Sequence, residues 1–262
     1  MKIDFGLTAT DYARHRAGFP DSFFERLETA GVFSPGQRVV DLGSGTGTLA
    51  RGFAQRGCRA IGVEPAAPMR AEAERLCAEA GSSVEFRDAH AEETGLPSNS
   101  ADLVVAGQCW HWFDRAAAAA ETARLLAKAG RLLVAHFDWI PIPGNVVDVT
   151  ERLIESHNPD WKLRGGSGIY PLWLVELARW GYRDLETWSF DLSVPYTPEG
   201  WRGRARASAG ISASLPPDRV EAFDRDLAAA IAERFPGRSV SVHHRVFSLL
   251  ARPPADRAET AD

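Results

Sequence analysis

Cysteine, lysine and long apolar runs are scarce in this sequence of 262 residues. The three cysteines, Cys58, Cys77 and Cys109, are too few and too widely spaced for a disulfide framework or a zinc cluster. We therefore expect reduced thiols and no metal site. No apolar run approaches the roughly 18 residues of a membrane-spanning helix. The first residues carry no hydrophobic signal core, so we expect a cytoplasmic protein with no membrane partner.

A concentration of positive charge is also lacking. The net charge is −5 and no basic block occurs, which disfavours a nucleic-acid partner. Only three of the 30 basic residues are lysines, and this composition is typical of a high-GC bacterial genome. The hydrophobic content of 45% and charged content of 25% fit an ordinary globular protein.

Short apolar segments alternate with helical patterns over the first half of the chain. The sequence predicts strands at 38–42, 59–64, 83–88, 101–107 and 131–139, and helices at about 46–56, 68–81 and 114–129. This alternation predicts an α/β fold with a parallel sheet. Further along, we expect helices at 170–181 and 218–235 and strands at 184–194 and 239–251.

A glycine-rich turn follows the first predicted strand. Gly43, Gly45 and Gly47 permit a tight turn and let backbone N–H groups approach a ligand closely. A dinucleotide fingerprint would place its third glycine where Thr48 stands, which disfavours a nicotinamide-dependent oxidoreductase. In an open parallel sheet, ligands bind at the carboxyl end of such a strand.

Acidic residues recur at the ends of the first three predicted strands, as Asp41, Glu64 and Asp88. A carboxylate such as that of Glu64 can accept two hydrogen bonds from a ribose diol. The carboxylate of Asp88 can accept from an exocyclic amine, and the apolar Ala89 beside it suits a base. Each carboxylate alone would be interpreted as a cap or a surface charge, but together they favour a nucleoside site.

These residues carry a resemblance to a known family. The segments are VVDLGSGTG (39–47), GVEPAAPM (62–69), RDAHAEETGLP (87–97), ADLVVAGQCWHWFD (101–114) and RLLAKAGRLLVA (124–135). They resemble class I S-adenosylmethionine-dependent methyltransferases of the small-molecule branch (methyltransferase type 11), similar to trans-aconitate methyltransferases. The resemblance covers about residues 8–140 well. It implies a Rossmann-like parallel sheet with a final antiparallel strand, in a three-layer α/β/α arrangement with helical lid insertions.

The resemblance also implies a cofactor site for S-adenosyl-L-methionine. Asp41 and the loop with Gly43, Ser44, Gly45 and Gly47 would hold the methionine end. Glu64 would hold the ribose, and Gln108 would lie near the sulfonium. Around the adenine we expect Pro65, Met69, Asp88 and Ala89, and the early segment YARHRAGFP would close the site through Tyr12 and Arg16.

The same reasoning divides the chain into parts of one structural domain. We expect an N-terminal helical cover over 1–36 and a cofactor-binding core over 37–140. An acceptor-binding lid that also completes the sheet would span 141–252, followed by a tail over 253–262. The partner would be a small-molecule acceptor, and the protein a monomer or a homodimer.

His111 is the candidate catalytic base, because a neutral hydroxyl acceptor must lose a proton. The alternative interpretation is a structural histidine between two tryptophans. All eight tryptophans lie at or after Trp110, and we expect Trp110, His111, Trp112 and Trp139 to line an apolar or aromatic acceptor. The function predicted is small-molecule methylation, on oxygen, in secondary metabolism. The alternatives are a cyclase or another protein that binds the cofactor without methylating.

One basic run is left over, formed by Arg202, Arg204 and Arg206. The simpler interpretation is a solvated face. The alternative is a clamp on a carboxylate or phosphate of the acceptor.

Overall fold

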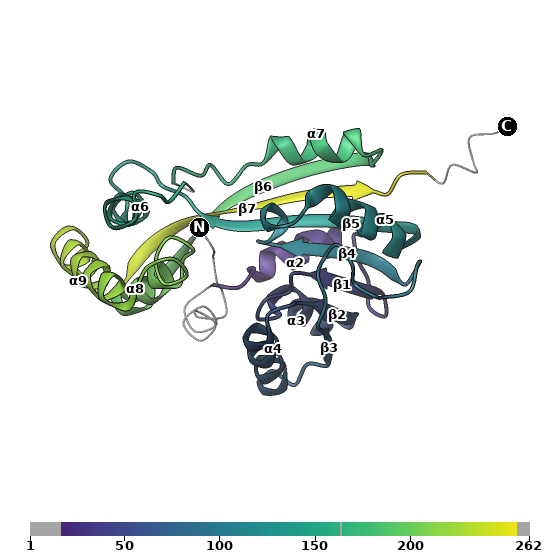
Figure 1. Ribbon diagram of the computed structural model, residues 1–262, viewed down its shortest axis with the longest axis horizontal. Coiled ribbons are helices and arrows are strands. Elements are labelled where there is room, and N and C mark those ends of the chain that lie inside the picture. Colours follow the sequence, from purple (N-terminus) through teal and green to yellow (C-terminus); the bar gives the residue numbers. More distant parts are fainter. Residues whose placement is uncertain (1–16, 163, 256–262) are drawn as a thin grey trace. The chain divides into compact units, whose positions relative to one another are not determined.

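The computed structural model describes residues 17–162 and 164–255 (Figure 1). Its strands are β1 (Arg38–Leu42), β2 (Arg59–Val63), β3 (Val84–Arg87), β4 (Ala101–Gly107), β5 (Leu126–Trp139), β6 (Arg183–Tyr196) and β7 (Val240–Arg252). Its helices are α2 (Asp21–Thr29), α3 (Thr48–Ala54), α4 (Ala67–Glu79), η2 (Trp110–Trp112), α5 (Arg115–Leu125), α6 (Val146–His157), α7 (Pro171–Arg179), α8 (Pro198–Arg206) and α9 (Pro217–Arg234).

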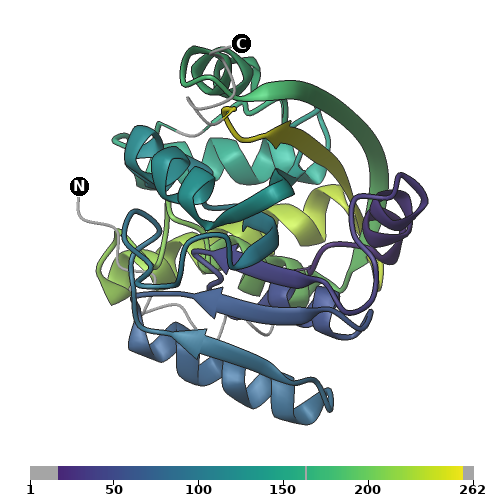
Figure 2. The same cartoon turned by 90° about the vertical axis from the view of Figure 1, so that its right-hand side faces the viewer.

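The strands form one seven-stranded sheet in the order β3-β2-β1-β4-β5-β7-β6. β1 pairs in parallel with β2 and β4, β2 with β3, and β4 with β5. Figure 2 shows β1, β2 and β3 side by side, with α4 running along β3. The sheet is mixed and mostly parallel, which confirms the predicted Rossmann-like α/β fold.

The predicted helix over 114–129 was too long at its C-terminal end. Asp114 caps the helix, because its carboxylate accepts from the N–H of Ala117 at 3.2 Å. The helix ends at Leu125, and Leu126 is already extended and paired with Ala101 of β4. Pairing with the sheet therefore overrides the helix preference of the alanines that follow.

The chain divides into two compact units. Among the described residues, the larger unit comprises Gly18–His136, Tyr170–Ser189 and 247–255, and the smaller unit comprises Ala17, Phe137–Ile169 and Phe190–Val246. The strands β5, β6 and β7 each contribute residues to both units. The carboxyl ends of β1 to β4 belong to the larger unit.

Each unit has an apolar core of its own. In the larger unit, the central strands contribute fully buried side chains such as Leu42, Val104 and Leu132. In the smaller unit, Trp201, Phe223 and Leu227 of α8 and α9 are fully buried. Among the described residues, no helix has the length and apolar character needed to cross a bilayer.

Candidate functional site

The turn after β1 adopts a backbone that only glycine accommodates easily. Gly43 and Gly47 have φ of 60° and 74°, in the left-handed region. A Cβ on Gly43 would lie 2.9 Å from Phe113 Cζ, and one on Gly47 would lie 2.9 Å from Phe86 Cζ. The loop therefore packs closely on one side, and side chains at these positions would displace it.

Glu64, which follows β2, holds this loop in place. Its Oε2 accepts from the N–H of Gly45 at 3.0 Å, and its Oε1 accepts from the N–H of Ala66 at 2.9 Å. The carboxylate thus joins the glycine loop to the start of α4. Each oxygen keeps a second lone pair, so the carboxylate can still accept from a diol.

Asp41 lies at the end of β1, with only 2% of its surface exposed. Its Oδ2 accepts from the N–H of Ala50 at 2.9 Å. Burial, with a smaller contribution from the charge of Glu64, raises the pKa of this carboxyl to about 8, although the Ala50 hydrogen bond opposes both. A cation bound nearby would favour the ionised form.

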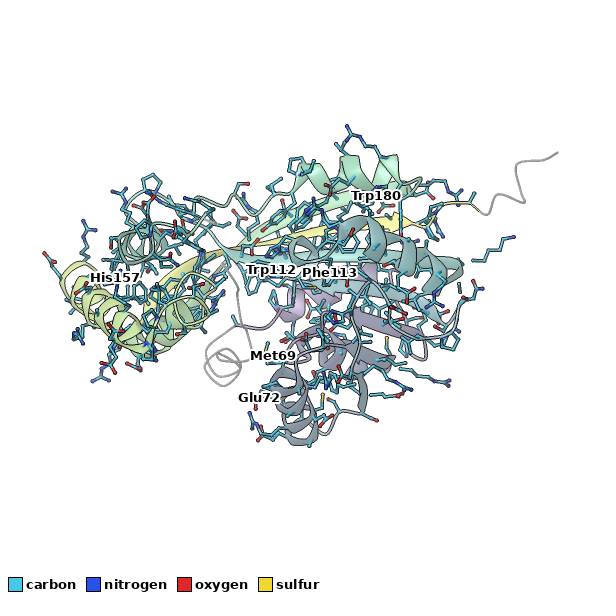
Figure 3. The ribbon with its side chains drawn as sticks, viewed as in Figure 1. Met69, Glu72, Trp112, Phe113, His157 and Trp180 are labelled. Carbon is cyan, nitrogen blue, oxygen red and sulfur yellow. The ribbon has the colours of Figure 1, made fainter. Side chains whose placement is uncertain are left out.

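The third carboxylate, Asp88, is mostly exposed after β3. It pairs with Arg70, whose Nη2 lies 2.8 Å from Asp88 Oδ2, while Nη1 donates to the carbonyl of Glu64 at 2.6 Å. Met69 is 5% exposed at the start of α4 (Figure 3), and Ala89 packs partly buried against the core. Pro65 is exposed.

The chain after β4 turns sharply at Gln108. This residue has φ of 66°, which is uncommon for a side-chain-bearing residue, and its N–H donates to the carbonyl of Ala135 in β5 at 2.9 Å. Such strained conformations cluster at ligand sites. Cys109 follows, with its Sγ 3.1 Å from the carbonyl oxygen of Leu42 in β1.

The short helix η2 carries the predicted acceptor residues of the larger unit. Trp110 is fully buried, His111 is half-buried and Trp112 is 42% exposed, so the last of these presents the most surface to a ligand. Trp112 lies beside Phe113 in Figure 3. The His111 ring lies 4.3 Å from the Trp112 ring and 5.4 Å from that of His136, which is 1% exposed in β5.

The larger unit thus brings most of the predicted residues to the carboxyl ends of β1 to β4. Trp139 belongs to the smaller unit, and Tyr12 and Arg16 lie outside the described residues. Arg70 of α4 is a site residue that the sequence did not predict, because its partner Asp88 lies 18 residues away along the chain, after β3.

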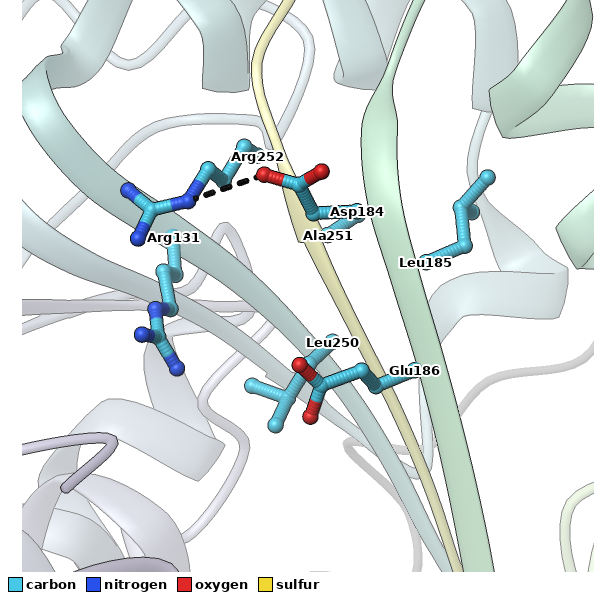
Figure 4. A pocket seen from close by; sticks show the side chains of 7 residues that line it. All are labelled: Arg131, Asp184, Leu185, Glu186, Leu250, Ala251 and Arg252. Carbon is cyan, nitrogen blue, oxygen red and sulfur yellow. Dashed lines mark ion pairs between the residues drawn. The ribbon is translucent and has the colours of Figure 1, made fainter. Parts of the chain in front are cut away.

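A separate pocket of about 310 Å³ also lies in the larger unit (Figure 4). It is lined by Arg131, Asp184, Leu185, Glu186, Leu250, Ala251 and Arg252, none of them a predicted site residue. An ion pair of 3.2 Å between Arg252 Nε and Asp184 Oδ2 crosses it. Within the described residues, no group of three His, Cys, Asp or Glu side chains is placed to hold a metal ion.

Comparison with known proteins decides the kind of domain. A family model described as a methyltransferase domain matches residues 40–134. Residues 40–134 of the chain form a methyltransferase domain. The cofactor of this domain is S-adenosylmethionine.

Relatives of the domain are found among both sequences and structures. The chain is 36% identical over 136 residues to an uncharacterized methyltransferase of Mycobacterium tuberculosis, covering 50% of this chain and 51% of that protein. The chain spans about half the length of the curated relatives it matches first.

The fold is also similar to that of solved methyltransferases. A putative type II methyltransferase from Anaeromyxobacter dehalogenans matches with a TM-score of 0.69 and 22% identity, over 92% of this chain and 99% of that one. Phosphoethanolamine N-methyltransferase 2 of Haemonchus contortus, in complex with S-adenosyl-L-methionine, matches with a TM-score of 0.55 and 19% identity, over 96% of this chain and 57% of that one.

The residues at the strand ends fit this cofactor. Ser44 Oγ is buried and has no hydrogen-bond partner among the described residues, so a polar group of a ligand would satisfy it. The buried carboxyl of Asp41 suits a cationic ligand, and Glu64 retains lone pairs for hydroxyl groups. The adjacent Met69 offers an apolar surface to a base.

Proposed function

We propose that this protein transfers the methyl group of S-adenosylmethionine to an oxygen atom of a small-molecule acceptor. The observation that carries the proposal is the position of Asp41, Glu64 and Asp88 at the ends of three adjacent parallel strands, where Glu64 accepts a hydrogen bond from the glycine loop. This arrangement presents the carboxylates to a nucleoside with a positively charged tail.

Each part of the site would hold a different part of the cofactor. Asp41 and the loop over 43–47 would hold the methionine end, where the buried Ser44 hydroxyl gains a partner. Glu64 would hold the ribose. Pro65, Met69, Asp88 and Ala89 would surround the adenine, and Gln108 would lie near the sulfur.

The cofactor, when bound, supplies a methyl group on a positively charged sulfur that leaves readily as a thioether. An acceptor oxygen would be held in line with that methyl group. The protein mainly aligns the two partners and excludes water, and alignment alone can lower the barrier by roughly 7–11 kcal/mol. His111 would take the proton that the acceptor hydroxyl loses.

Aromatic side chains support an apolar or aromatic acceptor. Trp110 and Trp112 would line its binding site, with Trp112 the most exposed of the η2 residues. A role in secondary metabolism stays a prediction that rests on the arginine-rich, lysine-poor composition. The alternative, a cyclase or other non-methylating protein, uses the same cofactor residues and differs in its products.

Turnover with a panel of hydroxylated aromatic compounds tests the proposal. We expect formation of S-adenosylhomocysteine together with a methyl ether. His111→Ala should bind the cofactor normally yet lose most turnover, because the acceptor keeps its proton. His90→Ala, which removes an exposed histidine of the same unit, is the matched control. Cofactor binding without any S-adenosylhomocysteine would favour the non-methylating alternative. Full turnover by His111→Ala would leave that histidine a structural role.

A further inference from the structure

Arg70, near the start of α4, joins the ends of two neighbouring strands through a single guanidinium group. Its Nη1 donates to the carbonyl of Glu64, which follows β2, at 2.6 Å. Its Nη2 lies 2.8 Å from Oδ2 of Asp88, which follows β3. The side chain of Arg70 is 16% exposed, whereas that of Asp88 is 71% exposed. The arginine is therefore held within the fold, while the carboxylate that it holds remains accessible to a ligand.

The support for Arg70 at Glu64 is itself fixed on several sides. The N–H of Glu64 donates to the carbonyl of Arg87 in β3 at 3.0 Å. Both oxygens of the Glu64 carboxylate accept from backbone N–H groups, one in the glycine loop and one before α4. Because Glu64 has little freedom to move, its carbonyl gives Arg70 a firm second contact. The guanidinium thus sets where one carboxylate lies relative to the other.

The pairing leaves half of the Asp88 carboxylate open. Arg70 contacts Oδ2, and within the part of the chain that the structure describes Oδ1 accepts no hydrogen bond. An ionised carboxylate accepts hydrogen bonds and donates none. The open oxygen therefore suits an N–H group of a ligand and disfavours a carbonyl oxygen. A side chain that is already held in place loses less freedom when it binds a ligand.

We propose that Arg70 is a positioning residue for base recognition, which fixes the Asp88 carboxylate so that the site selects a base with an amino group over one with a carbonyl oxygen. The inference rests on the proposed function, in which Asp88 lies beside the adenine. The 6-amino group of adenine can donate to Asp88 Oδ1, whereas a 6-carbonyl oxygen would meet a second acceptor with no hydrogen between them. Arg70 acts through Asp88 and not by contact with the base.

Binding of two ligands to the full chain tests this inference. The probes are S-adenosylhomocysteine and its deaminated form S-inosylhomocysteine, which carries a carbonyl oxygen in place of the amino group, and calorimetry measures the affinity for each. The wild type should bind the first about 10- to 100-fold more tightly, as a hydrogen bond to a charged group implies. Arg70→Gln should lower this ratio about 2- to 10-fold, because the Asp88 side chain must then be ordered on binding.

Three further variants assign the effect. Asp88→Asn should lower the ratio more than Arg70→Gln does, because an amide can donate to the carbonyl oxygen. Arg70→Lys should give an intermediate ratio, because an ammonium lacks the planar fork that holds two acceptors at once. Arg75→Gln is the matched control on the same helix, where Arg75 pairs with Glu72 at 2.6 Å and with Glu79, and it should keep the wild-type ratio.

A loss of affinity that is equal for the two ligands in Arg70→Gln would overturn the inference, since it would show a general structural role. An unchanged ratio in that variant would overturn it too, as would an equal fall in Arg75→Gln. An ion pair with so exposed a partner contributes little to stability, so Arg70→Gln should fold, and Arg70→Lys provides the same comparison if it does not.

The wild type separates this inference from the proposed function. If it binds both ligands equally tightly, the base is not selected through Asp88 and the inference fails, while the cofactor site stands. If the folded wild type binds neither ligand, the cofactor site is refuted, and the proposed function falls together with the role of Arg70.

Discussion

Replacing Asp41 with asparagine should stabilise the protein at alkaline pH and at the same time weaken cofactor binding. The wild-type carboxyl is almost fully buried and accepts one hydrogen bond, from Ala50. Asparagine has nearly the same shape, and its carbonyl oxygen can accept that bond. The substitution therefore removes a buried charge with little change in packing.

The magnitude follows from the pKa of Asp41. Burial raises this pKa from 3.8 to about 8, so folding disfavours the ionised form. A raised carboxyl pKa makes the contribution of the group to stability greatest below pH 3.8. That contribution is lost progressively as the pH rises towards 8. A shift of about four units corresponds to about 6 kcal/mol of unfolding free energy across this range.

Urea unfolding at pH 4.5, 6.5 and 8.5 measures this effect. The stability of Asp41→Asn relative to the wild type should increase with pH and approach several kcal/mol at pH 8.5. If the amide NH₂ of asparagine finds no acceptor, this gain in stability is smaller by about 1–3 kcal/mol. Parallel stability profiles for the two proteins would show that Asp41 ionises normally in the fold and would refute the reasoning.

Cofactor binding provides the second half of the test. The α-ammonium group of the methionine end favours the carboxylate, so binding should release a proton from Asp41 below pH 8. Affinity of the wild type for S-adenosylhomocysteine should then rise with pH, by up to about tenfold per unit. The asparagine variant should bind more weakly and lose this part of the pH dependence. Calorimetry in buffers with different ionisation enthalpies counts the proton released.

Two further predictions concern stability. Gly47→Ala should destabilise the protein more than Gly95→Ala does in thermal unfolding. Both glycines have positive φ, but only at Gly47 would the new Cβ approach Phe86, at 2.9 Å. Equal decreases in melting temperature for the two variants would show that this contact relaxes freely. The second prediction concerns Glu121, whose pKa burial alone would raise. Hydrogen bonds from Arg124, and from the hydroxyl and N–H of Thr94, outweigh burial and lower the pKa to about 2. Its contribution, about 3 kcal/mol, should be complete above pH 4.5 and lost as the pH falls towards 2. Glu121→Gln should flatten that part of the acid-unfolding curve, and an unaltered curve would contradict the assignment.

The cofactor side of the site could be predicted from the sequence because its signals are local. A glycine turn between a strand and a helix needs no long-range information, and strand ends of a parallel sheet meet at one edge. The predicted carboxylates Asp41 and Glu64 accordingly lie beside the loop over 43–47. The hydrogen bond from Gly45 to Glu64 could not be predicted, because it depends on how two strands are set side by side.

Other features depended on tertiary contacts that a single sequence does not display. The end of α5 at Leu125 is decided by pairing of Leu126 with β4, against the helix preference of the local residues. The basic run of α8 has alternating spacing, yet the helix sets Arg202 and Arg206 on one face and buries Arg204. The proximity of His136 to His111 likewise follows from the adjacency of β4 and β5.

The sharing of β5, β6 and β7 by both units restricts how this protein can be re-engineered. A transplant of the smaller unit from a relative would require cuts within three strands rather than at one linker. Each cut would interrupt a ladder of backbone hydrogen bonds, and a one-residue error in register would turn every following side chain to the opposite face. Changes in the smaller unit should therefore be more accessible through point substitutions than through exchange of modules.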